Sequence, residues 1–401
     1  MTDKTFSDVR DLASFGARPL FDAPRHVNRP GAPARADFEA LVDGIWQRRW
    51  FTNDGPLVKE LESRLAVFLD VPHCVLTCNA TAALGLVLGA LEVTGEVLLP
   101  SYTFISTAHV LHLSGMTPVF CDVAPDMNIA PSDCVARMTE RTGALIATHV
   151  WGRPCEVRDL EDICAAAQIP LLFDAAHAFG SRHMGRRIGA FGVAEVFSLH
   201  ATKAFHACEG GLVTTADGAL AQRLRMMRNF GFSGSDRVDY AGVNAKMSEL
   251  HAAMGLANLD IWPETKARSC AIHEVYQQGL GQIGGLDLRV PPPEEDNNHH
   301  YVVAEIDAAR FGMDRDRLCA LLEAENVLAR RYFFPGGHRS PPHDLLAARA
   351  GLSLPETEAL CNRVLVLPGG AAADPDETAA ICGLIRFIAD NAAKILRSAN
   401  G

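Results

Sequence analysis

The chain has 401 residues with a formal net charge of −11, and 48% of its residues are hydrophobic. A chain of this length usually divides into two domains, because a single hydrophobic core stops growing at smaller sizes. The negative charge argues against general binding to nucleic acid or to an acidic membrane, since both surfaces attract basic proteins. The eleven cysteines show no C-x-x-C pair and no zinc-like spacing, which indicates no metal site and reduced thiols in a cytoplasmic protein.

One apolar stretch, CVLTCNATAALGLVLGALEV at 74–93, is long enough to cross a bilayer. Asn79 and two threonines divide it, so a buried strand, a polar turn and a buried helix fit it better. The first residues of the chain are polar and of mixed charge, unlike a signal peptide. We therefore expect no membrane association.

Seven short apolar runs alternate with helix-length segments between about Asp54 and Thr215. This alternation predicts a mostly parallel sheet with helices on both faces. Ligands bind such sheets beyond the carboxyl ends of the strands, so the polar residues that follow each run are candidates for a site. The runs are CVLTC, EVLLP, TPVFC, ALIATHV, IPLLFD, EVFSL and GLVTT.

The pattern changes in the second half of the chain and indicates a smaller α+β domain. Helices are predicted through KMSELHAAMGLANLDIW, EVYQQ and DRDRLCALLEAENV, a strand in HHYVVAEID, and a last helix from about 376 to 396. The Pro-rich VPPPEEDNN at 290–298 is predicted to connect to this domain. We predict an N-terminal segment at 1–50, a large domain at 51–260 and a small domain at 261–401. The first fifty residues could also pack with the small domain.

An isolated lysine and a strand-end carboxylate are the first candidates for chemistry. Lys203 lies in FSLHATKAFHACEGG at 197–211, and no other residue between Glu195 and Glu209 is fully charged at neutral pH. Asp174 follows the apolar LLF, with His177 three residues later. A carboxylate in this setting needs a cationic or proton-donating partner. A helix cap at Asp174 and a core role for His177 remain equally consistent with the local sequence.

Two further strand ends carry candidates for ligand binding. In TCNATAAL, the backbone N–H groups of Ala80 and Thr81 open a helix beside the Thr81 hydroxyl, which has the form of an anion site. A helix cap by Asn79 or Thr81 explains this stretch equally well. In PSYTF, Phe104 could cover a planar ligand or belong to the core.

The stretch GLGQIGG at 279–285 matches the dinucleotide-binding fingerprint letter for letter. Its context differs, because it follows a predicted helix and leads into the strand-like GLDLRV. The fingerprint must follow a strand and open a helix. An NAD-dependent oxidoreductase is therefore the weakest of the functions considered.

Six stretches together resemble one family. TCNATAAL, PSYTF, FDAAHAFG, FSLHATK, EGG and GVNAKMSEL occur in the order and spacing of the DegT/DnrJ/StrS sugar aminotransferases. The resemblance begins near TNDGPLVKELE and covers nearly the whole chain. It implies the α/β type I aminotransferase fold, with a seven-stranded large-domain sheet and a smaller α+β domain. It also implies pyridoxal 5'-phosphate as the cofactor.

The resemblance assigns catalytic roles to Lys203 and Asp174. Lys203 corresponds to the lysine that binds the cofactor covalently and, once released, moves the proton of the substrate's α carbon. Such a lysine must be unprotonated for part of the time, which an apolar setting favours. Asp174 corresponds to the carboxylate that pairs with the protonated pyridine nitrogen and keeps the ring electron-withdrawing.

The remaining cofactor contacts also follow from the resemblance. His177 would lie near the 3-oxygen of the cofactor, where relatives often have glutamine, and Phe104 would cover the ring. Asn244 corresponds to a residue that reaches the cofactor phosphate of the neighbouring subunit, which implies a homodimer with shared active sites. The phosphate cradle would consist of Ala80, where glycine is usual, Thr81 and Ser198.

The family implies L-glutamate as the amino donor and a keto sugar on a nucleoside diphosphate as the acceptor. The motif sequences are most similar to those of family members that act at C4 of dTDP-4-keto-6-deoxyglucose. Enzymes that act at C3, on GDP- or UDP-linked sugars or on keto-cyclitols stay open. A related sugar dehydratase has histidine at the lysine position, and a regulatory protein would not need Lys203 with Asp174. The loop RRYFFPGGH is either a solvated basic loop or part of the binding site for the anionic substrate. In the second case the candidate residues are Arg330, Arg331, Tyr332 and His338.

Overall fold

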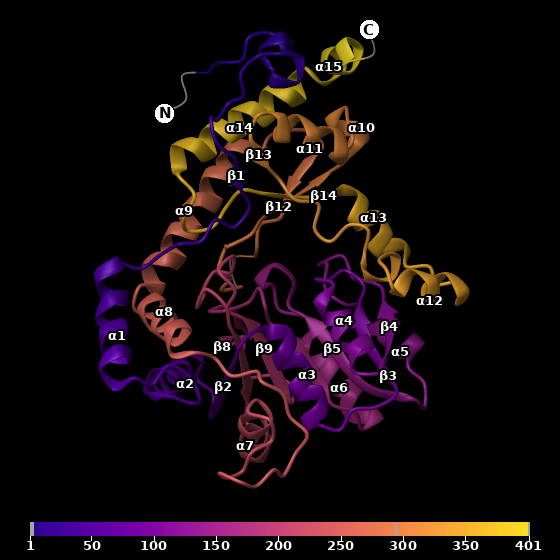
Figure 1. The fold of residues 1–401 in the computed structure, drawn as a ribbon. Coiled ribbons are helices and arrows are strands. Elements are labelled where there is room, and N and C mark those ends of the chain that lie inside the picture. The colour runs from indigo at the N-terminus through magenta and orange to yellow at the C-terminus, as the bar shows by residue number, and fades with distance from the viewer. Residues whose placement is uncertain (1–3, 293–294, 400–401) are drawn as a thin grey trace.

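The computed structural model describes residues 4–292 and 295–399, and its largest element is a seven-stranded sheet (Figure 1). The strand order is β2-β10-β9-β6-β5-β3-β4. Strand β10 runs antiparallel to both of its neighbours, and the other pairs are parallel. Each of the seven predicted runs forms one strand, so the mostly parallel sheet is confirmed. The strands are β2 (His73–Thr77), β3 (Glu96–Pro100), β4 (Thr117–Cys121), β5 (Thr142–Thr148), β6 (Leu171–Asp174), β9 (Ala194–Ser198) and β10 (Gly211–Thr215).

Helices cover both faces of this sheet, and the alternation of side chains along the strands divides the core between them. Leu98 and Leu145 point to one helical layer, and their neighbours Val97 and Ile146 point to the other. The first layer contains α2 (Pro56–Leu69), α5 (Pro131–Arg137), α6 (Val157–Ala167) and α8 (Glu249–Asp260). The second contains α3 (Ala80–Ala90), α4 (Ser106–Leu113) and α7 (Gly218–Met227).

The stretch at 74–93 is divided as its sequence predicts, between β2, a turn and α3. The Asn79 side chain caps α3 by accepting a hydrogen bond from the Ala82 N–H at 2.8 Å. Across the described ranges, no helix combines the length and the apolar character needed to cross a membrane.

A second, antiparallel sheet forms the core of the C-terminal part, which lies above the large sheet in Figure 1. Its strands are β11 (Leu286–Leu288), β12 (Val302–Ile306) and β14 (Val364–Leu367). The helices of this part of the chain are α9 (Trp262–Leu280), α10 (Ala308–Phe311), α11 (Arg315–Ala324), α12 (His343–Arg349), α13 (Pro355–Arg363), α14 (Pro375–Asp390) and α15 (Ala392–Ala399). Short elements complete the chain: β7 (Arg182–His183), β8 (Arg186–Arg187), and 3-10 turns at Val9–Asp11, Ala13–Phe15, Val150–Gly152 and Gly337–Arg339.

Two details of the sequence prediction for this part are wrong. The single helix predicted at 376–396 breaks at Asn391, whose side-chain amide donates to the Phe387 carbonyl at 2.9 Å and competes with continued helix. The Pro-rich segment joins β11 to β12, which pair in one sheet, so it does not connect two domains. Its residues 293–294 lie outside the described residues. The stretch GLGQIGG does follow a helix and precede a strand, since it lies between α9 and β11.

The N-terminal segment spans both parts of the molecule. Strand β1 (Arg25–His26) pairs with β13 (Val327–Leu328) of the C-terminal part, whereas α1 (Arg35–Arg48) packs beside α8. Between them, the Gly31 carbonyl accepts a hydrogen bond from the His206 ring at 2.8 Å. The buried Glu325 carboxylate binds Lys4 and the backbone N–H groups of residues 13 and 20. These contacts hold residues 27–31 against the loop that contains Lys203.

Candidate active site

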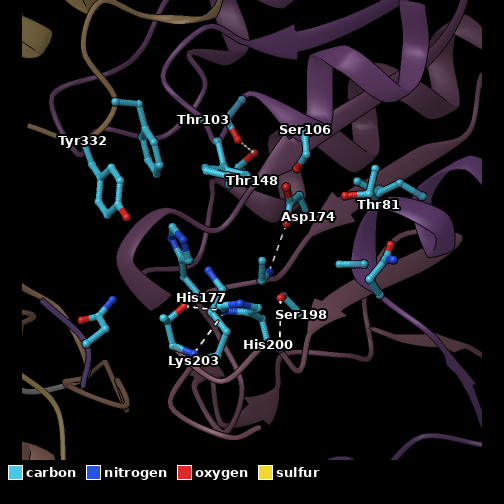
Figure 2. Close-up of a pocket in the computed structure, with 18 of the residues that line it drawn as sticks. Thr81, Thr103, Ser106, Thr148, Asp174, His177, Ser198, His200, Lys203 and Tyr332 are labelled. Carbon is cyan, nitrogen blue, oxygen red and sulfur yellow. Dashed lines mark hydrogen bonds between the residues drawn. The ribbon is translucent and has the colours of Figure 1, made fainter. Parts of the chain in front are cut away.

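A cavity of about 360 Å³ lies beyond the carboxyl ends of the central strands. Figure 2 shows Thr81 on one side of it and Tyr332 on the opposite side, with Asp174, Ser198 and Lys203 between them. Seven residues of the predicted cofactor site, in four separate sequence stretches, are thus brought together, as expected for strand ends of one sheet. They are Ala80, Thr81, Phe104, Asp174, His177, Ser198 and Lys203.

The Thr81 side of the cavity has unpaired backbone donors. Asn79 takes the Ala82 N–H with its side chain and the Ala83 N–H with its carbonyl. Within the described ranges, no residue accepts from the N–H groups of Ala80 and Thr81, which begin the eleven-residue helix α3. The cap and the anion site that the sequence offered as alternatives therefore coexist. Ala80 does not have a positive φ angle, so alanine fits at the position where the family resemblance leads us to expect glycine.

Asp174 ends β6 and is held by two donors. The Thr107 hydroxyl donates to one carboxylate oxygen at 2.7 Å, and the Ala176 N–H donates to the other at 3.1 Å. Thr103 lies 3.4 Å from Thr107 and 3.1 Å from Thr148, and all three hydroxyl groups are buried. Because Thr107 gives its only proton to the carboxylate, the chain of hydroxyl groups has one direction, with each threonine donating toward Asp174.

Lys203 lies half-buried in the wall of the cavity. Its Nζ donates to the Tyr301 hydroxyl at 3.2 Å. Burial lowers the pKa of Lys203 to about 8, although the charge of Asp174 acts in the opposite direction. The fold thus supplies the carboxylate that is missing from the local sequence, but its effect on the pKa is smaller than that of burial. A substantial fraction of this amine is neutral near physiological pH.

His177 is held flat between aromatic rings. It stacks on Trp151 with centroids 5.3 Å apart, and its Nδ1 accepts a hydrogen bond from the backbone N–H of Trp151 at 3.3 Å. Burial, followed by the charges of Lys203 and His300, keeps the pKa of His177 well below its usual value. The ring is therefore neutral and carries its proton on Nε2. Phe104 is 53% exposed at the rim, so core packing does not account for it.

The predicted substrate residues do not all reach the site. A second cavity of about 430 Å³ shares Thr103, Phe104, Tyr332 and Phe333 with the first. Arg330, Arg331 and Tyr332 line it, whereas His338 lines neither cavity. His338 is fully buried and bonds to the Ser101 hydroxyl at 2.6 Å and the Glu358 carboxylate at 3.1 Å. It stabilises the loop and does not face the substrate.

Asn244 lies outside the cavity of its own chain. Its side chain is exposed and accepts a hydrogen bond from Lys246 Nζ at 2.8 Å. Residue 244 forms an isolated β-bridge with residue 229, in a hairpin that projects from the large sheet. This position is compatible with a contact to another subunit.

Several lining residues had no signal in the sequence. Tyr301 falls in a strand pattern that indicates only core packing. Asn28 comes from the N-terminal segment and belongs to none of the six motifs. His200 bonds to Thr202 through its Nδ1 at 2.8 Å and lies within FSLHATK, so the motif itself could have identified it. The threonine hydroxyl groups around Asp174 become visible only when the strands are assembled.

Residues 34–386 match the model of the DegT/DnrJ/EryC1/StrS aminotransferase family. This chain belongs to that family. The aminotransferase is 33% identical over 344 residues to the dTDP-4-amino-4,6-dideoxy-D-glucose transaminase of Escherichia coli, covering 85% of this chain and 92% of the relative. It is 27% identical over 343 residues to the GDP-perosamine synthase of Vibrio cholerae, covering 84% and 92%. Its fold matches the crystal structure of DesI, solved in the presence of its TDP-sugar product, with a TM-score of 0.93, 42% identity and coverage of 98% and 100%.

The family is dependent on pyridoxal phosphate, and the cavity of the aminotransferase fits this cofactor. The unpaired N–H groups of Ala80 and Thr81 offer a place for a phosphate, and Asp174 offers an anion for a pyridinium. Lys203 offers an amine that is partly neutral. The type I aminotransferase fold expected from the sequence is confirmed.

Proposed function

We propose that this aminotransferase moves the amino group of L-glutamate to the C4 keto group of a nucleotide-linked deoxysugar, dTDP-4-keto-6-deoxyglucose. The observation that carries the proposal is the similarity to DesI over the whole chain, because DesI was solved with a TDP-sugar product. The relative from Escherichia coli, named for a dTDP-linked amino sugar, gives independent support. The similarity to GDP-perosamine synthase keeps GDP-linked 4-keto sugars as the second candidate.

The residues of the cavity divide the reaction among themselves. Pyridoxal phosphate, when bound, supplies an aldehyde that holds the amino group and a ring that withdraws electrons. Asp174, fixed by Thr107 and Ala176, presents its carboxylate to a pyridine nitrogen. The amine of Lys203 can accept and return a proton, because its pKa of about 8 lies near the working pH.

The other walls position the reactants. His177 is neutral and can donate a hydrogen bond from Nε2 without adding charge. Phe104 covers the open side of the cavity and excludes water from the reacting atoms. The backbone at the start of α3, with Ser198, holds the phosphate end.

The test of this function is an incubation with nitrogen-labelled L-glutamate and a panel of acceptors, followed by mass analysis. The panel contains 4-keto and 3-keto sugars linked to dTDP, UDP and GDP, and one keto-cyclitol. We expect the label to enter the dTDP-linked 4-keto sugar at the highest rate. Transfer to a 3-keto sugar or a cyclitol alone would contradict the proposal.

Arg330 is the better of the two arginines for binding the substrate phosphates. Within the described ranges it has no ion-pair partner, and its guanidinium stacks on Tyr332 at 5.0 Å. Arg331 is already paired with Asp316 at 3.1 Å and packs over Phe334. An arginine without an ion-pair partner in the wall of the second cavity is available for an anion. A paired arginine must first give up its carboxylate.

We expect Arg330→Ala to raise the KM for the nucleotide sugar by about 10–100-fold, the value of one charge-assisted contact. The KM for L-glutamate should change little. Arg331→Ala is the matched control and should cause a smaller increase, which steady-state kinetics of both variants will measure. Equal effects of the two variants would remove the distinction between the arginines.

We also propose a homodimer with shared active sites. Large apolar side chains stay exposed around the hairpin of Asn244, and near the C-terminal end of α1 and just after it, as expected for a face covered by a second copy. The Phe51 carbonyl accepts from the Glu249 N–H, so the residues after α1 contact the chain five residues beyond Asn244, and the Phe230 N–H donates to the Val243 carbonyl within the hairpin. The exposed residues are Trp46, Trp50, Phe51, Phe230, Phe232 and Val243.

The free, mostly buried cysteines support a reducing, cytoplasmic location.

Mixing two inactive variants tests the shared sites. Lys203→Ala removes the amine, and Asn244→Asp places a carboxylate where a partner's cofactor phosphate would lie. A mixed dimer would contain one site with both changes and one with neither, so we expect up to about a quarter of wild-type activity when half the dimers are mixed. Each variant must be inactive alone, and subunit exchange must be shown independently. With these controls met, a mixture without activity would refute sharing through Asn244.

A further inference from the structure

The hydroxyl group of Tyr301 is the hydrogen-bond partner of the Lys203 amine, at 3.2 Å. Tyr301 immediately precedes β12 of the C-terminal part, whereas Lys203 follows β9 of the large sheet. This hydrogen bond therefore joins the two parts of the molecule at the reacting amine. Nothing in the local sequence of either residue predicts it.

The segment before Tyr301 is hydrogen-bonded both to the loop after β6 and to the loop that contains Lys203. The Asn298 side chain donates to the His177 carbonyl at 2.8 Å and to the Phe179 carbonyl at 3.1 Å. The His300 ring bonds to the Thr202 carbonyl at 2.9 Å. Asn298 and His300 are both at least 95% buried, so these bonds are shielded from water. They fix the Tyr301 hydroxyl relative to the backbone that carries Lys203.

The Tyr301 ring is equally constrained. Its centroid lies 4.5 Å from that of His177, 5.0 Å from that of Trp151 and 5.0 Å from that of His300. The ring is 7% exposed and forms part of the cavity wall. A side chain packed on three rings cannot follow the lysine, so the lysine is held where the hydroxyl lies.

We propose that Tyr301 is a positioning residue, whose hydroxyl holds the Lys203 amine in place while that amine takes up and returns a proton. A phenol suits this role because it can accept from an ammonium and donate to a neutral amine. Burial keeps the pKa of Tyr301 well above its usual value, so the phenol stays uncharged throughout. The charged and titratable groups around this amine are Asp174, His177, His300 and Tyr301. The inference rests on the role of Lys203 in the proposed function.

The variant Tyr301→Phe removes the hydroxyl and keeps the ring, and Tyr276→Phe is its matched control. Tyr276 is fully buried and donates one hydrogen bond, to the Pro368 carbonyl at 2.8 Å, away from the cavity. Both variants therefore lose one buried hydroxyl group of the same kind. An effect on stability alone should be similar in the two proteins.

The first measurement uses the protein without cofactor. Lys203 is labelled with acetic anhydride over a range of pH, and its peptide is quantified by mass spectrometry. In Tyr301→Phe the ammonium loses a charge-assisted hydrogen bond, whereas the neutral amine loses a weaker one, so the labelling midpoint should fall by about one pH unit relative to wild type. Tyr276→Phe should keep the wild-type midpoint. An unchanged midpoint in Tyr301→Phe would overturn the proposal.

The second measurement uses the cofactor-loaded protein in the half-reaction with L-glutamate. We expect Tyr301→Phe to reduce the rate constant by about 10–100-fold, with an unchanged affinity for glutamate and a larger isotope effect with α-deuterated glutamate. Equal rate losses in both variants, or an unchanged isotope effect, would show only a structural role. A wrong assignment of Lys203 is detected separately, because the cofactor would then be found on another lysine.

Discussion

The buried amine of Lys203 imposes the constraint that the rest of the site satisfies. An ammonium group removed from water is unfavourable, and here burial outweighs the attraction of Asp174 and lowers the pKa of the lysine to about 8. Apart from Asp174, the titratable groups named around it add no compensating charge: His177 is neutral and Tyr301 is an uncharged phenol. The Lys203 amine can thus gain or lose a proton near physiological pH, whereas His177 and Tyr301 keep their protonation states.

The fold gives this amine fixed neighbours by assembling strand ends. Asp174, Ser198 and the start of α3 are separated in sequence but meet at one edge of the large sheet. The directed chain of threonine hydroxyl groups then fixes Asp174 from behind. The C-terminal part closes the cavity from the other side with Tyr301, Tyr332 and Phe333. The proposed cofactor contacts thus come from the large sheet, and the proposed substrate contacts come from the opposite wall.

Much of the architecture could be predicted because its signals are local. Each central strand is a short, mainly apolar run, and Asp174 and Thr81 lie at or just beyond the strand ends that these runs mark. Contacts made over long sequence distances were not predictable in this way. Asn28 enters the cavity because β1 pairs with β13, and Tyr301 meets Lys203 across 98 residues. His338 shows the opposite error, since a polar residue in a basic loop turned inward to bond with Ser101 and Glu358.

The central claim is that Lys203 is the lysine that holds the cofactor. The most direct measurement is reduction of the pyridoxal phosphate-loaded protein with sodium borohydride, followed by digestion and mass spectrometry of every lysine-containing peptide. We expect the cofactor on the peptide that contains Lys203, and no stable attachment in Lys203→Ala. Attachment to another lysine, such as Lys246 beside Asn244, or unchanged attachment in Lys203→Ala, would contradict the account.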